Sequence, residues 1–96
     1  MNRTRLMYVE PARAGAARIG RVRFSRTRRT ARYAGRDLTR EGDRYRDAET
    51  GEAFRLRAPR PDGRDAEEPR AVLVDEDARL EYWRDVRGRG LAMAAV

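Results

Sequence analysis

Cysteine and histidine are both absent from the 96 residues of the chain. Without them, the sequence offers no disulfide, no Cys/His metal site, no thiolate nucleophile and no imidazole base. Most hydrolase and oxidoreductase chemistries depend on such groups. We therefore expect a protein that is not an enzyme, with no catalytic residues, no bound metal and no cofactor.

Large apolar residues are also scarce, because Leu, Ile, Val and Phe make up only 15 of the 96 residues. This share lies below the roughly 20% at which disorder competes with folding. No run of about 18 apolar residues could span a membrane, and residues 1–10 lack the apolar middle of a signal peptide. We expect one small domain over 1–88 with a thin core, a flexible tail over 89–96, and a cytoplasmic location without membrane partners.

Positive charge is abundant, and all 23 basic residues are arginines. Arginine richness is typical of GC-rich coding, so the positions of the arginines are more informative than their number. Residues 1–40 hold twelve arginines against two carboxylates, whereas residues 41–96 hold eleven against fourteen. This asymmetry predicts a basic surface that meets an anionic partner, most often nucleic acid. The alternative is a solvated face enlarged by coding bias.

The N-terminal half shows the period-2 alternation of half-buried strands. In residues 18–24, Gly20, Val22 and Phe24 share one face, while Ile19 is out of phase, and we expect a bulge at Gly20 to correct the phase. A turn over 25–28 and a two-residue turn at 34–35 indicate a hairpin. The expected strands of this half are 5–10, 18–24, 29–33 and 36–40.

The C-terminal half predicts a second hairpin and one helix. Strands over 43–47 and 52–57 flank a turn ending in Gly51, a mobile loop covers 58–70, and a last strand covers 71–74. Asp75 is the expected N-cap of a helix over about 75–87, with Gly88 at its C′ position. We expect the face of this helix that carries Tyr82, Trp83 and Val86 to pack in the core.

These elements predict a mainly β fold with one C-terminal helix. The order of the strands fits a small curved antiparallel sheet, or a partly open SH3-like or OB-like barrel, sealed by the helix. Disorder is the rival interpretation. Strand periodicity, turn residues and an amphipathic helix all agree with one another, which favours a folded domain.

Four segments resemble an uncharacterised family of short bacterial proteins over most of residues 6–87. They are ARIGRVRFS at 17–25, YAG at 33–35, DAETGE at 47–52 and VDEDARLEYW at 74–83. The family carries a glycine soon after its Ser-x-Thr, where this chain has Arg28, so the tight turn there lacks its usual residue. The resemblance implies no established activity.

Members of that family sometimes bear the name of 1-deoxyxylulose-5-phosphate synthase, a thiamine-diphosphate enzyme. Such a site needs a Gly-Asp-Gly metal motif followed by an Asn ligand. In this chain Gly42-Asp43 is followed by Arg44, and the only asparagine is Asn2. The residues therefore do not support that name.

The basic segment supplies the candidate nucleic-acid-binding residues. Arginines would contact phosphates, and tyrosines among them would stack on bases, as on the curved sheets of OB-like folds. Both tyrosines have an alternative role in the thin core, where we also expect Tyr8 and Phe24. The candidate residues are Arg21, Arg23, Arg26, Arg28, Arg29, Arg32, Tyr33, Arg44 and Tyr45.

The carboxylates and the single serine have structural explanations. The acidic run 75–77 could hold a hard cation, but helix capping explains it better. Asp47 and Glu49 could form an acid-base pair, but local hydrogen bonds in a turn are the favoured explanation. Ser25 has no neighbouring base in the sequence to activate it.

The favoured function is non-enzymatic binding of RNA or single-stranded nucleic acid, with little sequence preference. The alternative is a protein-interaction or assembly module whose basic surface meets an acidic protein. A small enzyme using carboxylates and arginine is the least favoured of the three.

Overall fold

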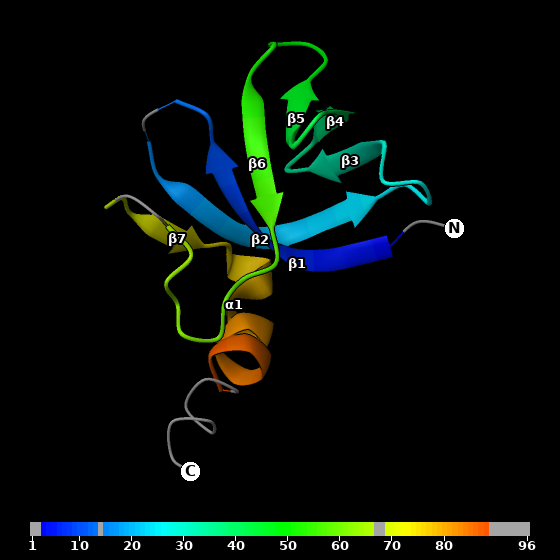
Figure 1. The fold of residues 1–96 in the computed structure, drawn as a ribbon. Coiled ribbons are helices and arrows are strands. Elements are labelled where there is room, and N and C mark those ends of the chain that lie inside the picture. The colour runs from blue at the N-terminus through cyan, green and yellow to red at the C-terminus, as the bar shows by residue number, and fades with distance from the viewer. Residues whose placement is uncertain (1–2, 14, 67–68, 89–96) are drawn as a thin grey trace.

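The computed structural model describes residues 3–13, 15–66 and 69–88. Six antiparallel strands form one continuous sheet, and β1 pairs with both β2 and β6, which closes the sheet into a barrel (Figure 1). The expected fold, a small barrel sealed by a C-terminal helix, is confirmed. The strands are β1 (Arg3–Pro11), β2 (Ala17–Phe24), β3 (Thr30–Tyr33), β4 (Arg36–Glu41), β5 (Arg44–Asp47) and β6 (Ala53–Arg57), and β7 (Val72–Val74) adds to β2 in parallel.

The β3–β4 hairpin forms at the predicted two-residue turn. Ala34 and Gly35 both have positive φ, at 50° and 77°, and Tyr33 faces Arg36 across the turn. Positive φ at both central positions is the type I′ geometry that matches the twist of paired strands. Local turn chemistry therefore sets the register of this hairpin.

The expected bulge at Gly20 is wrong. β1 and β2 pair without interruption from Arg3 opposite Phe24 to Val9 opposite Arg18. Ile19 is out of phase with Val22 because β2 is covered on both faces: Val22 packs inside the barrel, whereas Ile19 packs against the helix. A strand covered on both sides needs no single apolar face.

Two apolar clusters make up the core, one on each face of β1 and β2. Tyr8 belongs to the outer cluster, where burial and a hydrogen bond to Glu10 raise its pKa to about 12. The barrel interior holds Val9, Val22, Phe24, Ala31, Tyr33, Leu38, Tyr45 and Phe54. The outer cluster, between the sheet and the helix, holds Leu6, Tyr8, Ala17, Ile19, Ala78 and Tyr82.

The C-terminal helix runs through three helix types, which changes the face that it buries. A 3₁₀ turn η1 (Glu76–Ala78) leads into α1 (Arg79–Glu81) and then into the π-helical η2 (Tyr82–Arg87). Tyr82 is buried as expected, but Trp83 is 51% exposed, so its predicted place in the core is wrong. Gly88 keeps a helical φ of −59°, not the left-handed value expected at C′.

Asp75 occupies the N-cap position as expected, and its carbonyl accepts the Ala78 N–H, but its side chain makes no capping bond. Its carboxylate instead accepts hydrogen bonds of 2.5 Å from the Tyr33 hydroxyl and from Arg18 Nε. These bonds tie the start of the helix to the barrel interior. Gly20 lies beneath them, and a Cβ there would collide with Asp75 Oδ2 and with the Tyr33 ring.

The described part of the loop that follows β6 contains more internal contacts than expected for the mobile segment predicted over 58–70. Asp65 is buried, and its Oδ1 accepts a hydrogen bond from the backbone N–H of Arg60. Arg57 donates to the Asp65 carbonyl, and Gly63 lies against the Arg87 guanidinium. The expected tail, 89–96, lies outside the described residues. No helix in the described part of the chain is long and apolar enough to cross a membrane.

Candidate functional site

One end of the barrel is open, and we call it the mouth. β6 pairs with β1 only at Tyr8–Pro11, so the first half of β1 has no partner strand on that side. The start of β1 lies beside the β2–β3 turn, because Arg3 faces Phe24 across the two strands (Figure 1). The β4–β5 turn also reaches the mouth, since Asp43 lines the same hollow as Met7 and Phe24.

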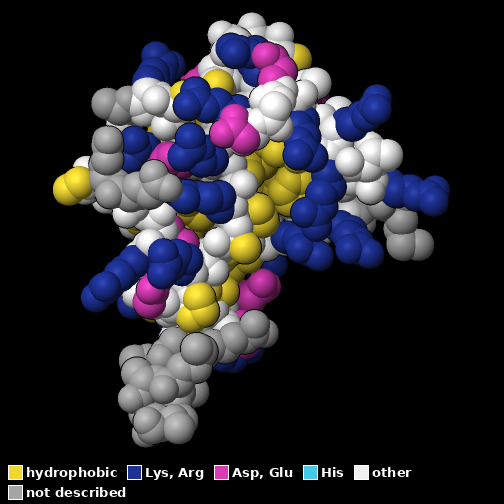
Figure 2. Space-filling model, viewed as in Figure 1, with side chains coloured by type: hydrophobic (Ala, Val, Ile, Leu, Met, Phe, Trp, Pro, Cys, Tyr) yellow, Lys and Arg dark blue, Asp and Glu magenta, His cyan; other side chains and the backbone are white. Residues whose placement is uncertain are grey.

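Arginines crowd the mouth. Figure 2 shows basic side chains gathered beside an apolar patch on the right, the side of the start of β1 in Figure 1, whereas acidic and basic side chains alternate on the left. Within the described residues, Arg3, Arg26 and Arg29 form no ion pair with a carboxylate. The arginines of the mouth are Arg3, Arg26, Arg28, Arg29, Arg40 and Arg44.

The β2–β3 turn holds Arg28 in a left-handed backbone conformation, with φ at 61°. The turn closes through a bond from the Arg28 N–H to the Ser25 carbonyl at 3.0 Å, and the Tyr45 hydroxyl donates to the Arg28 carbonyl at 2.7 Å. Left-handed conformations strain every residue except glycine. The tight turn therefore forms with arginine at the left-handed position, and neighbouring hydrogen bonds hold this strained residue in place.

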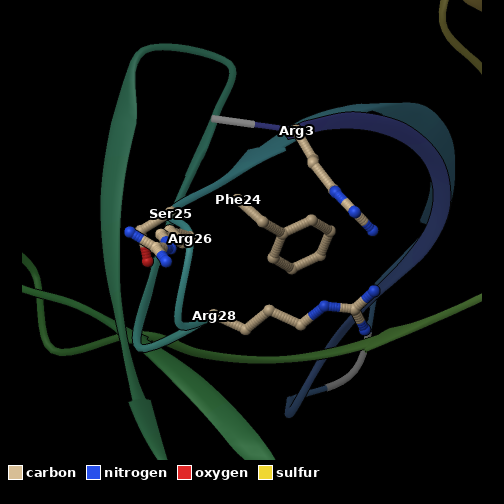
Figure 3. A pocket seen from close by; sticks show the side chains of 5 residues that line it. All are labelled: Arg3, Phe24, Ser25, Arg26 and Arg28. Atoms are coloured by element: carbon tan, nitrogen blue, oxygen red, sulfur yellow. The ribbon is translucent and has the colours of Figure 1, made fainter. Parts of the chain in front are cut away.

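A hollow of about 300 Å³ opens at the mouth beside Phe24. The Arg28 guanidinium lies 5.5 Å from the centroid of the Phe24 ring. In Figure 3, Arg3 and Arg28 extend past the ring from opposite sides, and their guanidinium groups gather on the same side of it. We call this the mouth hollow.

A second, shallower hollow of about 410 Å³ lies on the outer surface of β3 and its neighbours. Arg23 faces Arg32 across β2 and β3, and both line this outer groove. Arg32 also pairs with Asp37 at 3.1 Å, in an exposed position. Ser25 lines both the mouth hollow and the outer groove, so the two adjoin.

The expectation of exposed, stacking tyrosines is wrong. Tyr33 and Tyr45 are each only 8% exposed and belong to the interior cluster. Their hydroxyls are used internally, by Asp75 and by the Arg28 carbonyl. Burial and the bond to Asp75 raise the pKa of Tyr33. A barrel with so few apolar residues needs both rings in its core.

The predicted arginines fall into three places. Arg26, Arg28, Arg29 and Arg44 lie at the mouth, and Arg23 and Arg32 line the outer groove. Arg21 is separated from both, because it donates to Glu81 at 2.8 Å and to the Asp77 carbonyl on the helix. Sequence analysis missed Arg3 and Arg40, which reach the mouth only through strand pairing.

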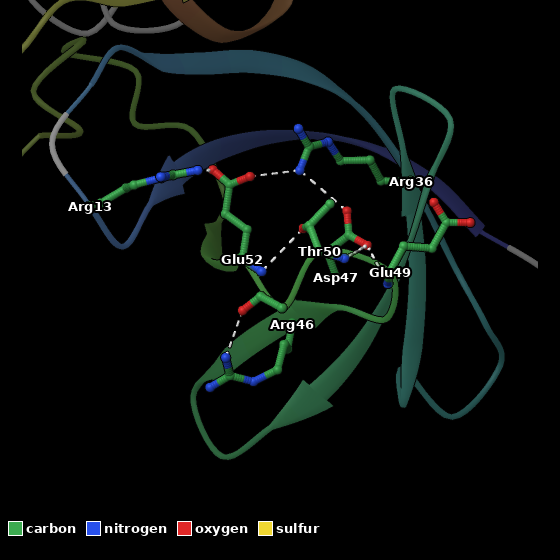
Figure 4. Close-up of polar contacts among 8 residues, drawn as sticks. Arg13, Arg36, Arg46, Asp47, Glu49, Thr50 and Glu52 are labelled. Carbon is green, nitrogen blue, oxygen red and sulfur yellow. Dashed lines mark hydrogen bonds and ion pairs between the residues drawn. The ribbon is translucent and has the colours of Figure 1, made fainter.

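At the opposite end of the barrel, arginines form ion pairs with carboxylates. Arg36 donates to Asp47 at 3.2 Å and to Glu52 at 2.7 Å, and Arg13 also approaches Glu52, at 3.6 Å (Figure 4). Asp47 accepts the backbone N–H groups of Glu49 and Thr50, which, with Arg36, lower its pKa. The turn explanation therefore holds for the Asp47 carboxylate, to which Glu49 contributes only its backbone N–H. Among the described residues, the arginines of this end are paired with carboxylates, in contrast to Arg3, Arg26 and Arg29 at the mouth.

The remaining polar candidates also serve local structure. The Ser25 hydroxyl accepts the Thr30 N–H at 3.2 Å. No group of three or more acidic residues that could hold a metal ion occurs among the described residues. Comparison with models of protein families, with curated proteins and with solved structures finds no match to this chain.

Proposed function

We propose that this protein is a non-enzymatic module that binds single-stranded nucleic acid, RNA or DNA, through its phosphates. The observation that carries the proposal is the set of arginines without described carboxylate partners at the mouth, next to two adjoining hollows. Arginine suits this task because its planar fork matches two phosphate oxygens. Several of these arginines gather at the mouth, whereas Arg36 at the opposite end is paired with Asp47 and Glu52.

The buried tyrosines change the expected mode of binding. With Tyr33 and Tyr45 inside the barrel, bases have no stacking platform there. Affinity then comes mainly from phosphates, which carry no sequence information. A flexible single strand can enter the mouth hollow and follow the outer groove, whereas a rigid duplex keeps its phosphates on a convex cylinder. We expect weak sequence preference and a preference for single strands.

Salt dependence tests the proposal. If the protein engages about five phosphates of a single strand, the logarithm of the association constant falls with the logarithm of salt at a slope near −3.5. Binding should then weaken about a hundredfold between about 50 mM and about 200 mM salt. Fluorescence anisotropy with short labelled RNA and DNA measures both quantities. Absence of binding at low salt would overturn the proposal.

Two matched double variants separate a located site from general positive charge. R26Q/R29Q removes two exposed arginines of the mouth, and R64Q/R79Q removes two exposed arginines from the loop after β6 and from α1. The first should flatten the salt slope by about 1.4, the contribution of two phosphate contacts. The second should leave it nearly unchanged. Equal effects would mean that no part of the surface is specialised.

A second candidate function rests on the outer surface of the helix. Leu80 is 74% exposed and lies three residues from the half-exposed Trp83. Exposed apolar side chains on one helix face often mark protein contacts. A protein-interaction module would keep its partner after nuclease treatment and lose it in L80S/W83S. Purified protein would also show the absorbance ratio of its one Trp and four Tyr, without excess at 260 nm.

A further inference from the structure

The mouth hollow brings two cations toward one space. Arg3 comes from β1 and Arg28 from the β2–β3 turn, and neither forms an ion pair with a carboxylate of the described residues. Their guanidinium groups lie on the same side of Phe24 (Figure 3). Like charges that converge without a counter-ion repel each other, and an anion placed between them would add two attractions that outweigh this repulsion.

Arg28 occupies its place at a conformational cost. Its φ of 61° is strained for arginine, and the Tyr45 hydroxyl and the Ser25 carbonyl hold its backbone there. The left-handed turn directs the side chain over the Phe24 ring into the hollow. Strained residues held by their surroundings concentrate at ligand sites. The conformation thus points to a use for this guanidinium.

The hollow is closed by the barrel core, which limits what can occupy it. Phe24 forms its wall and is only 3% exposed, so a chain cannot pass through into the barrel. The way out leads past Ser25 into the outer groove. A strand lying in the groove would therefore meet the hollow at its end.

We infer that the mouth hollow binds a phosphate monoester between Arg3 and Arg28, and that its ligand is the terminal phosphate of a single strand. A terminal phosphate carries a charge of about −1.5 to −2 and three acceptor oxygens, enough for two guanidinium forks. An internal phosphodiester carries a single charge. This inference rests on the proposed function, because the rest of the strand would lie along the arginines of the outer groove.

Oligonucleotides that differ only at their ends test the inference. One sequence is prepared with a 5′-phosphate, with a 3′-phosphate or with two hydroxyl ends, and binding to the full chain is measured by anisotropy at about 100 mM salt. We expect one phosphorylated form to bind at least about tenfold more tightly than the hydroxyl form, as two charge-assisted contacts allow. R3Q and R28Q should each abolish the preference, because the phosphorylated form then loses more affinity than the hydroxyl form, which loses at most one phosphate contact. R26Q/R29Q should weaken all forms alike and keep the preference.

A second arm tests the hollow without an oligonucleotide. Thermal shifts are compared for inorganic phosphate, 5′-AMP and adenosine at constant ionic strength, with R3Q and R28Q as controls. A shift with 5′-AMP but not adenosine, lost in both variants, supports a monoester site. A shift of equal size with inorganic phosphate assigns the recognition to the phosphate group alone.

The two arms separate failure of the site from failure of the proposed function. Salt-dependent binding of oligonucleotides with no preference for a phosphorylated end, and no shift with 5′-AMP, would overturn the inference and leave the proposed function in place. A shift with 5′-AMP without oligonucleotide binding would support the monoester site and overturn the strand as its ligand. Failure of both arms would overturn both.

Discussion

Some single residues in this small barrel have structural roles that could not be predicted from their residue type. Arg28 occupies a backbone conformation that favours glycine, and Gly20 is the one residue that fits under the bond between Tyr33 and Asp75. Both cases depend on neighbours far away in the sequence. Such a position is best tested by substituting the residue and asking whether the free energy of unfolding rises or falls.

Glycine and alanine at position 28 should reverse their usual order of stability. Alanine is normally the better residue, because glycine loses more backbone freedom on folding. At φ 61° the strain of a side chain outweighs this entropy, so Arg28→Gly should be more stable than Arg28→Ala by about 1 kcal/mol. Urea denaturation measures the free energy of unfolding of each variant.

The neighbouring Arg26 is the matched control, because it lies in the same turn without a positive φ. There the usual order should hold, with Arg26→Ala more stable than Arg26→Gly by about 0.5 kcal/mol. The same order at both positions would contradict the left-handed conformation of Arg28.

At the scale of elements, the helix shows how a change of period redistributes burial. Ala78, Tyr82 and Val86 follow one another at intervals of four and face the sheet. Trp83 lies beside this stripe, makes an edge contact with Tyr82 at 5.0 Å and is covered in part by Arg87. A π-helical turn holds more residues than an α-helical turn, so residues four apart stay on the buried face. Trp83 precedes Val86 by three residues and therefore lies outside that face.

Truncating the two aromatic side chains of η2 should have very different effects. Tyr82→Ala opens a cavity in the outer cluster and should cost about 3 kcal/mol, within the range for buried aromatic residues. Trp83→Ala removes a half-exposed ring and should cost less than about 1 kcal/mol. Urea denaturation compares the two. Similar losses in the free energy of unfolding would mean that Trp83 is buried in the core, as predicted from the sequence.

Elements whose signals are local could be predicted, and the contacts between them could not. The hairpin at Ala34-Gly35 and the turn at Gly51 follow from turn chemistry, and strand alternation placed Val22 and Phe24 correctly inside. Alternation alone does not tell whether a strand has one covered face or two, which is why Ile19 was misinterpreted. The burial of both tyrosines likewise depends on how few other apolar residues the barrel has.

The candidate site also combines residues that local sequence predicts with residues that only the fold brings together. The β2–β3 turn gathers Arg26, Arg28 and Arg29 because they are close in sequence, and this part was predicted. Arg3 joins them only because β1 runs antiparallel to β2 with Arg3 opposite Phe24. Pairing registers between distant strands depend on the whole fold. No local pattern in the sequence contains them.

For the whole molecule, two cores share the same two strands. β1 and β2 turn one face to the barrel interior and the other to the helix, so loss of either cluster uncovers the strands of both. Asp75 adds a direct link, because it joins the helix start to Tyr33 inside the barrel and to Arg18 at its edge. A domain this small with shared strands should unfold as one unit.

Two probes can test this cooperativity, since Trp83 reports on the helix and far-ultraviolet circular dichroism on the strands. In the unchanged protein, both signals should give the same midpoint in urea. Asp75→Ala leaves the buried Tyr33 hydroxyl without its acceptor and should lower the free energy of unfolding by about 2 kcal/mol. Because the link joins the two cores, both midpoints should fall together. A fall of the fluorescence midpoint alone would mean that the helix docks on a barrel that is stable without it.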